Sequence, residues 1–486
     1  MNNFNCSGGF FDDDRLDKLN EECGVFGIYS PSGVASELTY YGLFSLQHRG
    51  QEGCGIAASD GKVINYHKNT GLVTEAIKAD DLAHLPGKIA IGHVRYSTTG
   101  ANSALNTQPV IGYYFKGQLA VAHNGNLTNT AELRNRLTAN GSVFQTTIDT
   151  EVILNLLALY SHDDLLQAVR KTMLDLRGSY ALVVISEDKL IGIRDPHGNR
   201  PLCIGQTKDG GYVIASETCA LDTVGAKFLR DVDPGEIIII DENGMQSYEG
   251  FKAPKKALCV FEYVYFARPD SNIDGLNVSK ARRLIGRELA NEVKLDVDMV
   301  IPVPDSGTVA AIGYAEAAGL PFNQGIMKNR YAGRTFIQPT QAMRELMVHL
   351  KLSPIRQEIE GKKIAVVDDS IVRGTTSRRL IQRLREQGAK EVHFLVCSPP
   401  VKWPCFYGID TADRDKLIAA NMTNDEICEY LGADSLHYIS MEGMMRAVEN
   451  NGCTYCTACF SGDYQMGVPD EDSIGKDALE RSTRNN

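Results

Sequence analysis

Two adjacent carboxylates followed by a loop rich in hydroxyls are the most chemically suggestive feature of the sequence. The stretch VVDDSIVRGTTS, residues 366–377, reads as an apolar strand ending in Asp368 and Asp369. Hydroxyls and unpaired backbone N–H groups at the start of a helix bind a phosphate monoester, and glycine lets the backbone approach it. Carboxylates cannot lie on a phosphate, so they face sugar hydroxyls or a divalent cation. Solvated aspartates on a capped surface loop are the alternative, but the position at a strand's carboxyl end favours a ligand site. The predicted phosphate-binding residues are Ser370, Arg373, Gly374, Thr375 and Thr376.

A cysteine stands directly before an apolar segment near the start of the chain, in LNEECGVFGIYS, residues 19–30. Cys23 becomes a useful nucleophile if it is the first residue, because a free α-amine with a pKa of ~7.7–8.0 can act as the base for its thiol. The acidic leader 1–22 then reads as a propeptide cut after Glu22. A buried strand cysteine is the commoner fate of a lone cysteine, and Cys23 alone favours that alternative.

The C-terminal run CTYCTAC, residues 453–459, holds three cysteines with two residues between each pair. Such spacing places sulfur atoms around a metal ion or an iron–sulfur cluster, and zinc and iron–sulfur are both open from spacing alone. Cys259 and Cys405 lie far off in sequence and could complete four ligands, which leaves one thiol spare. Chance clustering of cysteines is the weaker alternative.

Length, composition and charge limit the number of domains, the kinds of partner and the cellular compartment. A chain of 486 residues is too long for one hydrophobic core, so we expect two domains. The net charge of −11 gives no support to a broad role with nucleic acid or a membrane. No apolar run is long enough to span a bilayer, and the polar start lacks the features of a secretory signal. We therefore expect a cytoplasmic protein whose twelve cysteines are in a reducing compartment.

The candidate nucleophile, Cys23, lies at the start of a strand-rich half of the chain, which must position it. Short apolar runs alternate with turn clusters over residues 24–250, and the turns at 195–199 and 208–212 are the strongest. One helical stretch, from about Thr150 to Asp175, interrupts them. This order predicts stacked sheets with few helices, segregated to the faces.

The pattern changes at the Pro- and Lys-bearing segment 252–256. Beyond it strands and helices alternate, which predicts a doubly wound parallel sheet. The predicted domains are therefore 23–255 and 256–486. A long basic stretch lies between Gln324 and Lys351. Loops of this length in a compact domain are usually either functional or disordered. The predicted helices are 278–293, 306–319 and 377–388, and the predicted strands are 298–304, 362–370 and 391–398.

The stretch 366–377 resembles the signature of type I phosphoribosyltransferases, which bind phosphoribosyl pyrophosphate. The resemblance implies that Asp368 and Asp369 face the ribose hydroxyls and Mg²⁺, and that Ser370–Ser377 holds the 5-phosphate. The turn PDSG, 304–307, matches the family's pyrophosphate loop, so Asp305 is implied as a ligand of the substrate and Ser306 as a neighbour of the metal. The implied metal ligands are Ser306, Asp368 and Asp369. The segment from Lys328 corresponds to the family's mobile lid, whose implied cations are Lys328, Arg330 and Arg334.

Five segments of the first half together resemble the N-terminal-nucleophile glutamine amidotransferases, which have an αββα sandwich. They are FSLQHRGQEG (44–53), GHVRYSTTG (92–100), AHNGNL (122–127), TTIDTEV (146–152) and RDPHGNRPL (194–202). The resemblance implies that Arg95 binds the α-carboxylate of glutamine, that Asp149 binds its α-ammonium group, and that Thr98 helps to fix it. Asn124 and Gly125 are implied as the oxyanion hole. In this family the α-amine is the base, so His48 is interpreted as structural.

The two halves in this order resemble the amidophosphoribosyltransferase family, in the branch with a propeptide and a [4Fe–4S] cluster. That resemblance implies the first committed step of purine synthesis: glutamine, phosphoribosyl pyrophosphate and water give 5-phosphoribosylamine, glutamate and pyrophosphate. It also implies a homotetramer inhibited by purine nucleotides. The implied cluster ligands are Cys259, Cys405, Cys456 and Cys459, with Cys453 as the unused thiol.

Two other functions compete with this one. A glutaminase fused to a sugar-phosphate isomerase needs no diol-binding acid pair, so VVDDSIVRGTT argues against it. A regulator that reuses the phosphoribosyltransferase fold as an effector sensor would need a basic DNA-binding domain, and the first half does not supply one.

Overall fold

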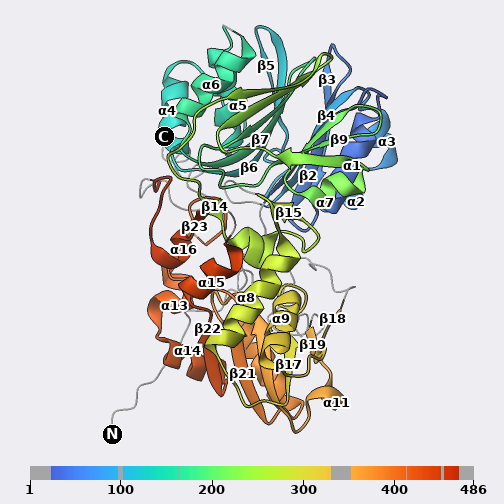
Figure 1. The fold of residues 1–486 in the computed structure, drawn as a ribbon. Coiled ribbons are helices and arrows are strands. Elements are labelled where there is room, and N and C mark those ends of the chain that lie inside the picture. Colours follow the sequence, from blue (N-terminus) through green and yellow to red (C-terminus); the bar gives the residue numbers. More distant parts are fainter. Residues whose placement is uncertain are drawn as a thin grey trace.

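The computed structural model describes residues 23–96, 102–162, 164–329, 352–411, 413–449 and 454–469. Two bodies follow one another along the chain, and Figure 1 shows the first, drawn in blue to green, above the second, drawn in yellow to red. The segment 252–256 lies between the last strand of the first body and the first strand of the second. Among the described helices, none has the length and apolar character needed to cross a bilayer.

The first body is built on two stacked antiparallel sheets. One has the order β11-β9-β10-β1-β4-β2-β3 and the other β13-β12-β8-β7-β6-β5. Apolar side chains of the two facing surfaces, among them Val25, Ile91, Ala122 and Val183, are buried against each other. The strands are β1 Gly24–Tyr29, β2 Gly53–Ser59, β3 Ile64–Thr70, β4 Ile89–Arg95, β5 Val110–Tyr114, β6 Gly117–Leu127, β7 Gly178–Ile185, β8 Leu190–Arg194, β9 Cys203–Gln206, β10 Tyr212–Ala215, β11 Lys227–Asp231, β12 Glu236–Asp241 and β13 Gly244–Glu249.

Helices cover the outer face of each sheet and complete an αββα sandwich. One core joins α1, α2 and α7 to the first sheet, and another joins α4, α5 and α6 to the second. The predicted sandwich is confirmed, and it carries more helix than the alternating pattern indicates. The helices of this body are α1 Ala35–Ser45, α2 Val73–Ala76, α3 Ala79–Ala83, α4 Thr130–Ala139, α5 Thr150–Tyr160, α6 Leu165–Asp175 and α7 Thr218–Thr223.

The single helix predicted from Thr150 to Asp175 is wrong in one respect, because it is two helices. Helix α5 ends at Tyr160, and α6 begins at Leu165. Asp164 has an extended backbone, and its carboxylate accepts a hydrogen bond from the backbone N–H of Gln167 at 2.8 Å. This N-cap starts a new helix, which the continuous apolar periodicity hides.

The second body has the predicted doubly wound design. Its parallel sheet has the order β17-β20-β21-β22, with β17 Met299–Pro302, β20 Lys363–Asp368, β21 Glu391–Val396 and β22 Ser435–Tyr438. One core buries its first face under α8 Val278–Glu292, α9 Thr308–Ala318 and α15 Met441–Val448. Another buries the opposite face under α12 Thr375–Glu386, α13 Ile418–Asn421 and α14 Asn424–Leu431. The carboxyl ends of β17 and β20 therefore meet at one edge.

Short elements complete this body. The strands β18 Ile326–Lys328 and β19 Leu352–Pro354 pair with each other and frame the stretch 330–351, which lies outside the described residues. Strands β15 Asn272–Ile273 and β16 Leu276–Asn277 form a hairpin before α8. The other short elements are the π-helix η2 Glu262–Phe266, α11 Arg356–Ile359 and the 3-10 helix η3 Arg414–Lys416.

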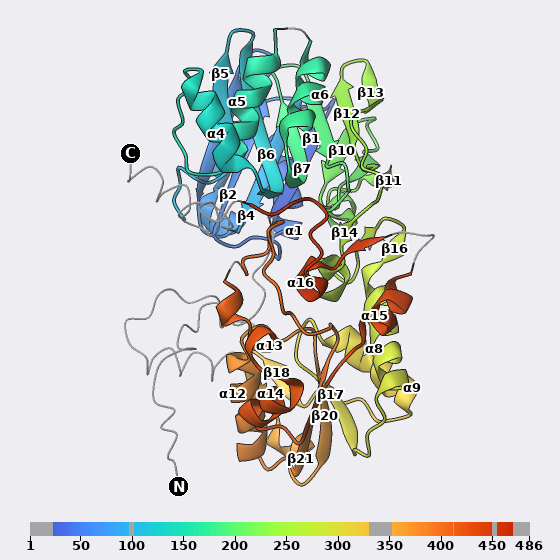
Figure 2. The same ribbon diagram turned by 90° about the vertical axis from the view of Figure 1, so that its left-hand side faces the viewer.

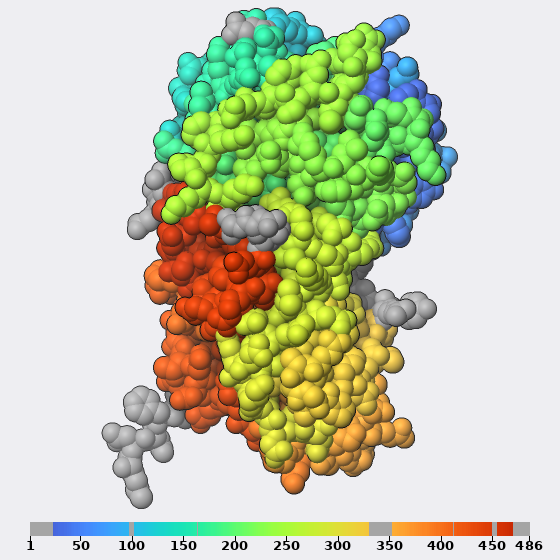
Figure 3. All heavy atoms as spheres, in the orientation of Figure 1, coloured from blue at the N-terminus to red at the C-terminus, as the bar shows by residue number. Residues whose placement is uncertain are grey.

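The C-terminal segment 454–469 returns to the region where the two bodies meet, which is called the waist below. Strand β23 Tyr455–Cys456 pairs in parallel with β14 Leu258–Cys259, and α16 Ala458–Ser461 follows. Figures 2 and 3 show this red segment against both bodies. Ser179 of the first body donates to the backbone oxygen of Tyr407 at 2.6 Å, and the Tyr407 hydroxyl donates to the backbone oxygen of Gly467 at 3.0 Å. Tyr407 thus connects the segment 454–469 to the first body.

Candidate active sites

Cys23 lies at the first described position, where the chain enters β1. Its side chain is almost wholly buried, and its thiol donates a hydrogen bond to the backbone oxygen of Tyr96 at 3.3 Å. Gly24 pairs with Val94 in the antiparallel β1–β4 ladder, which places Cys23 next to the end of β4, where Arg95 lies. Two residues that the sequence assigns to one glutamine site are thus neighbours at one sheet edge.

A chain of buried polar contacts connects that edge to Asp149. The ring Nε2 of His93, on β4, lies 3.0 Å from the backbone oxygen of His123, on β6. The ring Nδ1 of His123 lies 3.4 Å from a carboxylate oxygen of Asp149, whose other oxygen accepts from the backbone N–H of Leu127 at 3.1 Å. Burial raises the pKa of Asp149, but His123 and the backbone N–H groups outweigh it, so its pKa lies below the ordinary value. Asp149 therefore stays a carboxylate, as the binding of an ammonium group requires.

Burial lowers the pKa of His93 to about 3, so this histidine is neutral at physiological pH. The sequence singles out neither His93 nor His123, although both stand inside the quoted motifs. Their separate segments carry no sign that one histidine would bridge the two sheets and the other would orient an acid.

Asn124 and Gly125 occupy consecutive positions on β6, opposite Ala181 and Tyr180 of β7. The Asn124 side chain is buried, and its amide Nδ2 has no hydrogen-bond partner within the described residues. An unpaired buried N–H is costly, so such a donor indicates a place where a ligand oxygen binds. Gly125 has φ +143°, and a Cβ there would collide with the backbone oxygen of Ser179, so only glycine fits. These features suit the implied oxyanion hole.

Two further residues are assigned to the glutamine site or its surroundings, Thr98 and His48, and the structure describes only His48. Thr98 lies outside the described residues. His48 has the structural surroundings expected of it: its ring nitrogens lie 2.7 Å from a carboxylate oxygen of Glu217 and 3.2 Å from the backbone oxygen of Ser45.

The second site lies where β17 and β20 end. Asp368 and Asp369 are both buried to about one per cent exposure. Asp369 accepts hydrogen bonds from the hydroxyl of Ser370, at 2.7 Å, and from the hydroxyl of Ser306 on the loop after β17. A Cβ on Gly307 would collide with the backbone oxygen of Val367, so glycine lets this loop lie directly on β20. The structure thus joins the PDSG loop to the acid pair.

The predicted phosphate loop leads directly into helix α12. Gly374 is the N-cap with φ +81°, and Thr375 and Thr376 form the first turn. The backbone N–H groups of the first turn and the positive dipole end of this twelve-residue helix suit an anion. The side chains of Ser370 and Arg373, on the same loop, are buried. This arrangement is what a phosphate monoester needs.

Lys328, on β18, makes an ion pair with Asp305 of the PDSG loop, with 2.5 Å between Nζ and the carboxylate oxygen. Both side chains are exposed, so this pair is worth little as a stabilising contact. It places a cation beside the loop assigned to pyrophosphate. Arg330 and Arg334 lie outside the described residues.

The four candidate cluster cysteines gather at the waist. Cys259 pairs with Cys456 in the β14–β23 ladder. Cys405 packs against the small core that includes Cys456 and against the larger core that includes Cys259 and Cys459. Burial raises the pKa of Cys456 to about 12, and the neighbouring Cys405 adds to the effect. Burial and the neighbouring thiols of Cys405 and Cys456 also raise the pKa of Cys459 well above its ordinary value. Soft sulfur donors that repel each other's negative charge fit a positively charged iron–sulfur core. Cys453 lies outside the described residues.

In the part of the chain that the structure describes, neither the candidate Mg²⁺ ligands nor the candidate cluster cysteines are arranged as a preformed coordination shell. Across the described residues, no group of three or more His, Cys, Asp or Glu side chains is arranged to hold a metal ion. Mg²⁺ and the cluster therefore remain predictions, supported by the types of donor atom and their shared location.

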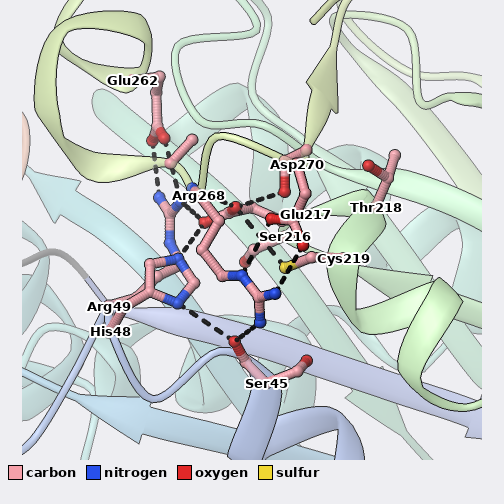
Figure 4. A network of polar contacts seen from close by, with 12 residues as sticks. Ser45, His48, Arg49, Ser216, Glu217, Thr218, Cys219, Glu262, Arg268 and Asp270 are labelled. Carbon is pink, nitrogen blue, oxygen red and sulfur yellow. Dashed lines mark hydrogen bonds and ion pairs between the residues drawn. The ribbon is translucent and has the colours of Figure 1, made fainter. Parts of the chain in front are cut away.

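A buried charge network that sequence reasoning misses lies between the two bodies (Figure 4). Arg49 contacts Glu217 and Glu262, and all three side chains are essentially inaccessible to solvent. Arg282 of α8 donates to the backbone oxygens of Tyr263 and Ala267. The motif LQHRGQEG includes Arg49, but its partners are more than 160 residues away, so spacing gives no signal.

Comparison with known proteins gives the same two-part division. A glutamine amidotransferase domain matches residues 93–223, and a phosphoribosyl transferase domain matches residues 275–400. The chain is 50% identical to an amidophosphoribosyltransferase of Bacillus subtilis over 93% of this chain and 95% of that one. It is also 50% identical to an amidophosphoribosyltransferase of Archaeoglobus fulgidus, over 93% and 99%.

Solved structures agree with these matches. The glutamine phosphoribosylpyrophosphate amidotransferase of B. subtilis, complexed with ADP and GMP, superposes with a TM-score of 0.87 at 48% identity, covering 92% of this chain and 98% of that one. A structure described as the allosteric regulatory enzyme of purine biosynthesis gives a TM-score of 0.89 at 48% identity, covering 94% and 99%. With relatives this similar over nearly its whole length, and with a glutaminase-type and a phosphoribosyltransferase-type site in one chain, this protein belongs to the amidophosphoribosyltransferase family, the glutamine-dependent enzymes of purine biosynthesis.

Proposed function

We propose that the chain makes 5-phosphoribosylamine from glutamine and phosphoribosyl pyrophosphate through the two sites described above. The observation that carries the proposal is the joint presence of Cys23 beside Arg95 at one sheet edge and of the Ser306–Asp369 contact at the other site. The first site suits the release of ammonia from glutamine, and the second suits the use of ammonia at the sugar. An enzyme that carried out only one of these half-reactions would not need both sites.

In the first half-reaction the Cys23 sulfur attacks the amide carbon of glutamine. The α-amine of Cys23 takes the thiol proton and returns a proton to the departing nitrogen, so ammonia leaves and a γ-glutamyl thioester remains. Asn124 Nδ2 and the backbone N–H of Gly125 stabilise the oxyanion. Arg95 binds the α-carboxylate of the substrate, Asp149 binds its α-ammonium group, and Thr98 helps to fix it. Water then releases glutamate.

In the second half-reaction ammonia displaces pyrophosphate at C1 of the sugar. Asp368 and Asp369 hold the ribose hydroxyls, while the start of α12, with Ser370, Arg373, Gly374, Thr375 and Thr376, holds the 5-phosphate. Lys328 and the Asp305–Ser306 turn face the leaving pyrophosphate. Mg²⁺ held by Ser306, Asp368 and Asp369 would neutralise charge on the pyrophosphate.

Further properties of the branch with a propeptide and a cluster belong to the same proposal. Residues 1–22 are removed to free the amine of Cys23, and Cys259, Cys405, Cys456 and Cys459 hold a [4Fe–4S] cluster. We further propose a cytoplasmic homotetramer, regulated by purine nucleotides. The nucleotides bound to the similar B. subtilis enzyme support this regulation.

The alternative from a different functional class is an effector-binding regulator on a phosphoribosyltransferase fold. The glutaminase-type first body argues against it, because a regulator would not need one. Glutamine-dependent pyrophosphate release separates the two, because a regulator would release none.

The decisive experiment replaces the nucleophile. Cys23→Ala should abolish product formation from glutamine and leave formation from ammonium salts intact, measured as pyrophosphate release. Full glutamine-driven turnover by this variant would refute the proposal. Intact-mass measurement tests processing, since the active chain should begin at Cys23, and activity with glutamine in a chain that keeps residues 1–22 would contradict the terminal-amine model.

A further inference from the structure

A fully buried ion cluster connects the two bodies next to the candidate nucleophile. Arg49, on the turn after α1, and Glu217, directly before α7, come from the first body, and Glu262, at the start of the π-helix η2, comes from the second. The Arg49 guanidinium contacts Glu262 through both terminal nitrogens, at 3.0 and 2.6 Å, and contacts Glu217 at 2.6 Å. Figure 4 shows both carboxylates converging on this side chain.

Within the cluster, Glu217 is held from more than one direction. Glu217 also accepts from the backbone N–H of Arg268 at 2.9 Å and from the Ser271 hydroxyl at 2.7 Å, both in the second body. Burial raises the pKa of Glu217, but the charges of His48 and Arg49 outweigh it and hold that pKa well below its ordinary value. Glu217 is therefore ionised, and its contacts with both bodies fix its position.

The same guanidinium reaches the nucleophile. Arg49 Nε donates a hydrogen bond to the backbone oxygen of Cys23 at 3.1 Å. The Arg49 side chain also packs on Gly24, where an added Cβ would lie 3.3 Å from Arg49 Cδ. Because strand pairing between β1 and β4 begins at Gly24, the carbonyl of Cys23 lies beyond the ladder, and a side chain holds it.

Burying three charges is a poor way to gain stability, because desolvation offsets their attraction. A fixed guanidinium is, however, a good way to hold a terminal residue. With no residue before it, a processed Cys23 is joined to the chain only through its carbonyl carbon. The hydrogen bond from Arg49 fixes the plane of the Cys23–Gly24 peptide, and that plane sets the point from which the thiol and the α-amine project.

We propose that Glu262 is a positioning residue for the glutaminase nucleophile, supplied by the phosphoribosyltransferase half of the chain. Its carboxylate orients Arg49, and Arg49 fixes the carbonyl of Cys23, so that the thiol and the amine point at the glutamine amide. The inference rests on the proposed role of Cys23, and it makes the first half-reaction depend on a residue of the second body.

The main test uses Glu262→Gln, which keeps the shape of the side chain but cannot accept both Arg49 bonds. Misplacing a reacting group by about 1 Å costs on the order of 10²-fold in rate. We expect kcat for glutamine hydrolysis to fall by about 10- to 100-fold, the KM for glutamine to change less than threefold, and ammonia-dependent synthesis to stay within twofold of the parent. Alkylation of Cys23 by iodoacetamide, followed by mass spectrometry, should slow in parallel.

Asp274→Asn is the matched control. Asp274 also makes a two-pronged ion pair across the two bodies, to Arg194 at 2.8 and 3.0 Å. The other hydrogen bonds of Arg194 go to the backbone oxygens of Gly198, Arg200 and Val232, whereas Arg49 contacts Cys23 itself. The Asp274→Asn variant should keep the glutamine kcat. Equal losses in the two variants, or an equal loss of ammonia-dependent synthesis in Glu262→Gln, would show a general structural effect and overturn the inference.

Arg49→Lys keeps a positive charge but lacks the Nε donor, and should lose glutamine kcat in the same way if Glu262→Gln folds poorly. Normal glutamine kcat in both Glu262→Gln and Arg49→Lys would also overturn the inference. The proposed function fails separately, through Cys23→Ala retaining its use of glutamine.

Discussion

The Ser306 hydroxyl donates a hydrogen bond to a carboxylate oxygen of Asp369, although 63 residues separate them in sequence. The parallel pairing of β17 with β20 causes this contact, because both strands deliver their loops to the same sheet edge. Ser370 donates to the other oxygen of the same carboxylate. Asp369 is thus held by two hydroxyls, one on each carboxylate oxygen.

Asp369→Asn should therefore impair the sugar site without touching the thiol site. We expect synthesis from ammonium salts and synthesis from glutamine to fall together by about 10²-fold, because a preorganised charge is lost. Half-maximal activity should need more Mg²⁺. Pyrophosphate release, titrated with Mg²⁺ and with either nitrogen donor, measures both effects. A loss confined to the glutamine reaction would contradict the assignment.

Asn124→Ala should remove one oxyanion donor. Its Nδ2 is buried without a partner in the described part of the structure, so truncation should disturb the resting state little. We expect kcat for glutamine hydrolysis to fall by about 10²–10³-fold with a nearly unchanged KM, and ammonia-dependent synthesis to persist. Asn155→Ala on α5, whose amide donates to the backbone oxygen of Glu151, is the control and should hydrolyse glutamine normally. A raised KM at unchanged kcat would mean that Asn124 binds substrate instead.

Asp231→Asn should stabilise the protein at neutral pH. Burial and the neighbouring Asp274 raise the pKa of Asp231 to about 6 from an ordinary 3.8. A raised carboxyl pKa favours folding when the group is protonated, so this contribution is present below about pH 4 and is lost as the pH rises to about 6. The gain in Tm of the variant over the parent should be small at pH 4 and reach a plateau above about pH 7. A pH-independent difference would contradict the shifted titration.

Cluster assembly should quench the fluorescence of Trp403, the only tryptophan in the chain. Its backbone N–H donates to the backbone oxygen of Cys459 at 3.0 Å, so the indole belongs to the same small region as the proposed ligands. Anaerobic reconstitution with iron and sulfide should lower its emission, and Cys405→Ser should prevent the change. Equal emission with and without bound iron and acid-labile sulfide would count against this cluster site.

The sequence by itself determined the local elements and most of the candidate chemistry. Strand β20 and helix α12 flank Asp368 and Gly374 as the spacing predicts, because an apolar run, a turn glycine and an amphipathic stretch each act within a few residues. The same local reasoning missed the break between Tyr160 and Leu165, since one side-chain cap overrides a continuous apolar periodicity.

Only the tertiary structure decided which distant groups meet. Glu262 lies 213 residues from Arg49, and Cys259 pairs with Cys456 although almost 200 residues of the second body separate them. No local pattern encodes such contacts, because they arise when whole sheets and helices pack and bring chain segments together at a cost in loop-closure entropy. The sequence therefore names the candidate nucleophile and the acid pair, while the packing of the two bodies decides which distant groups surround them.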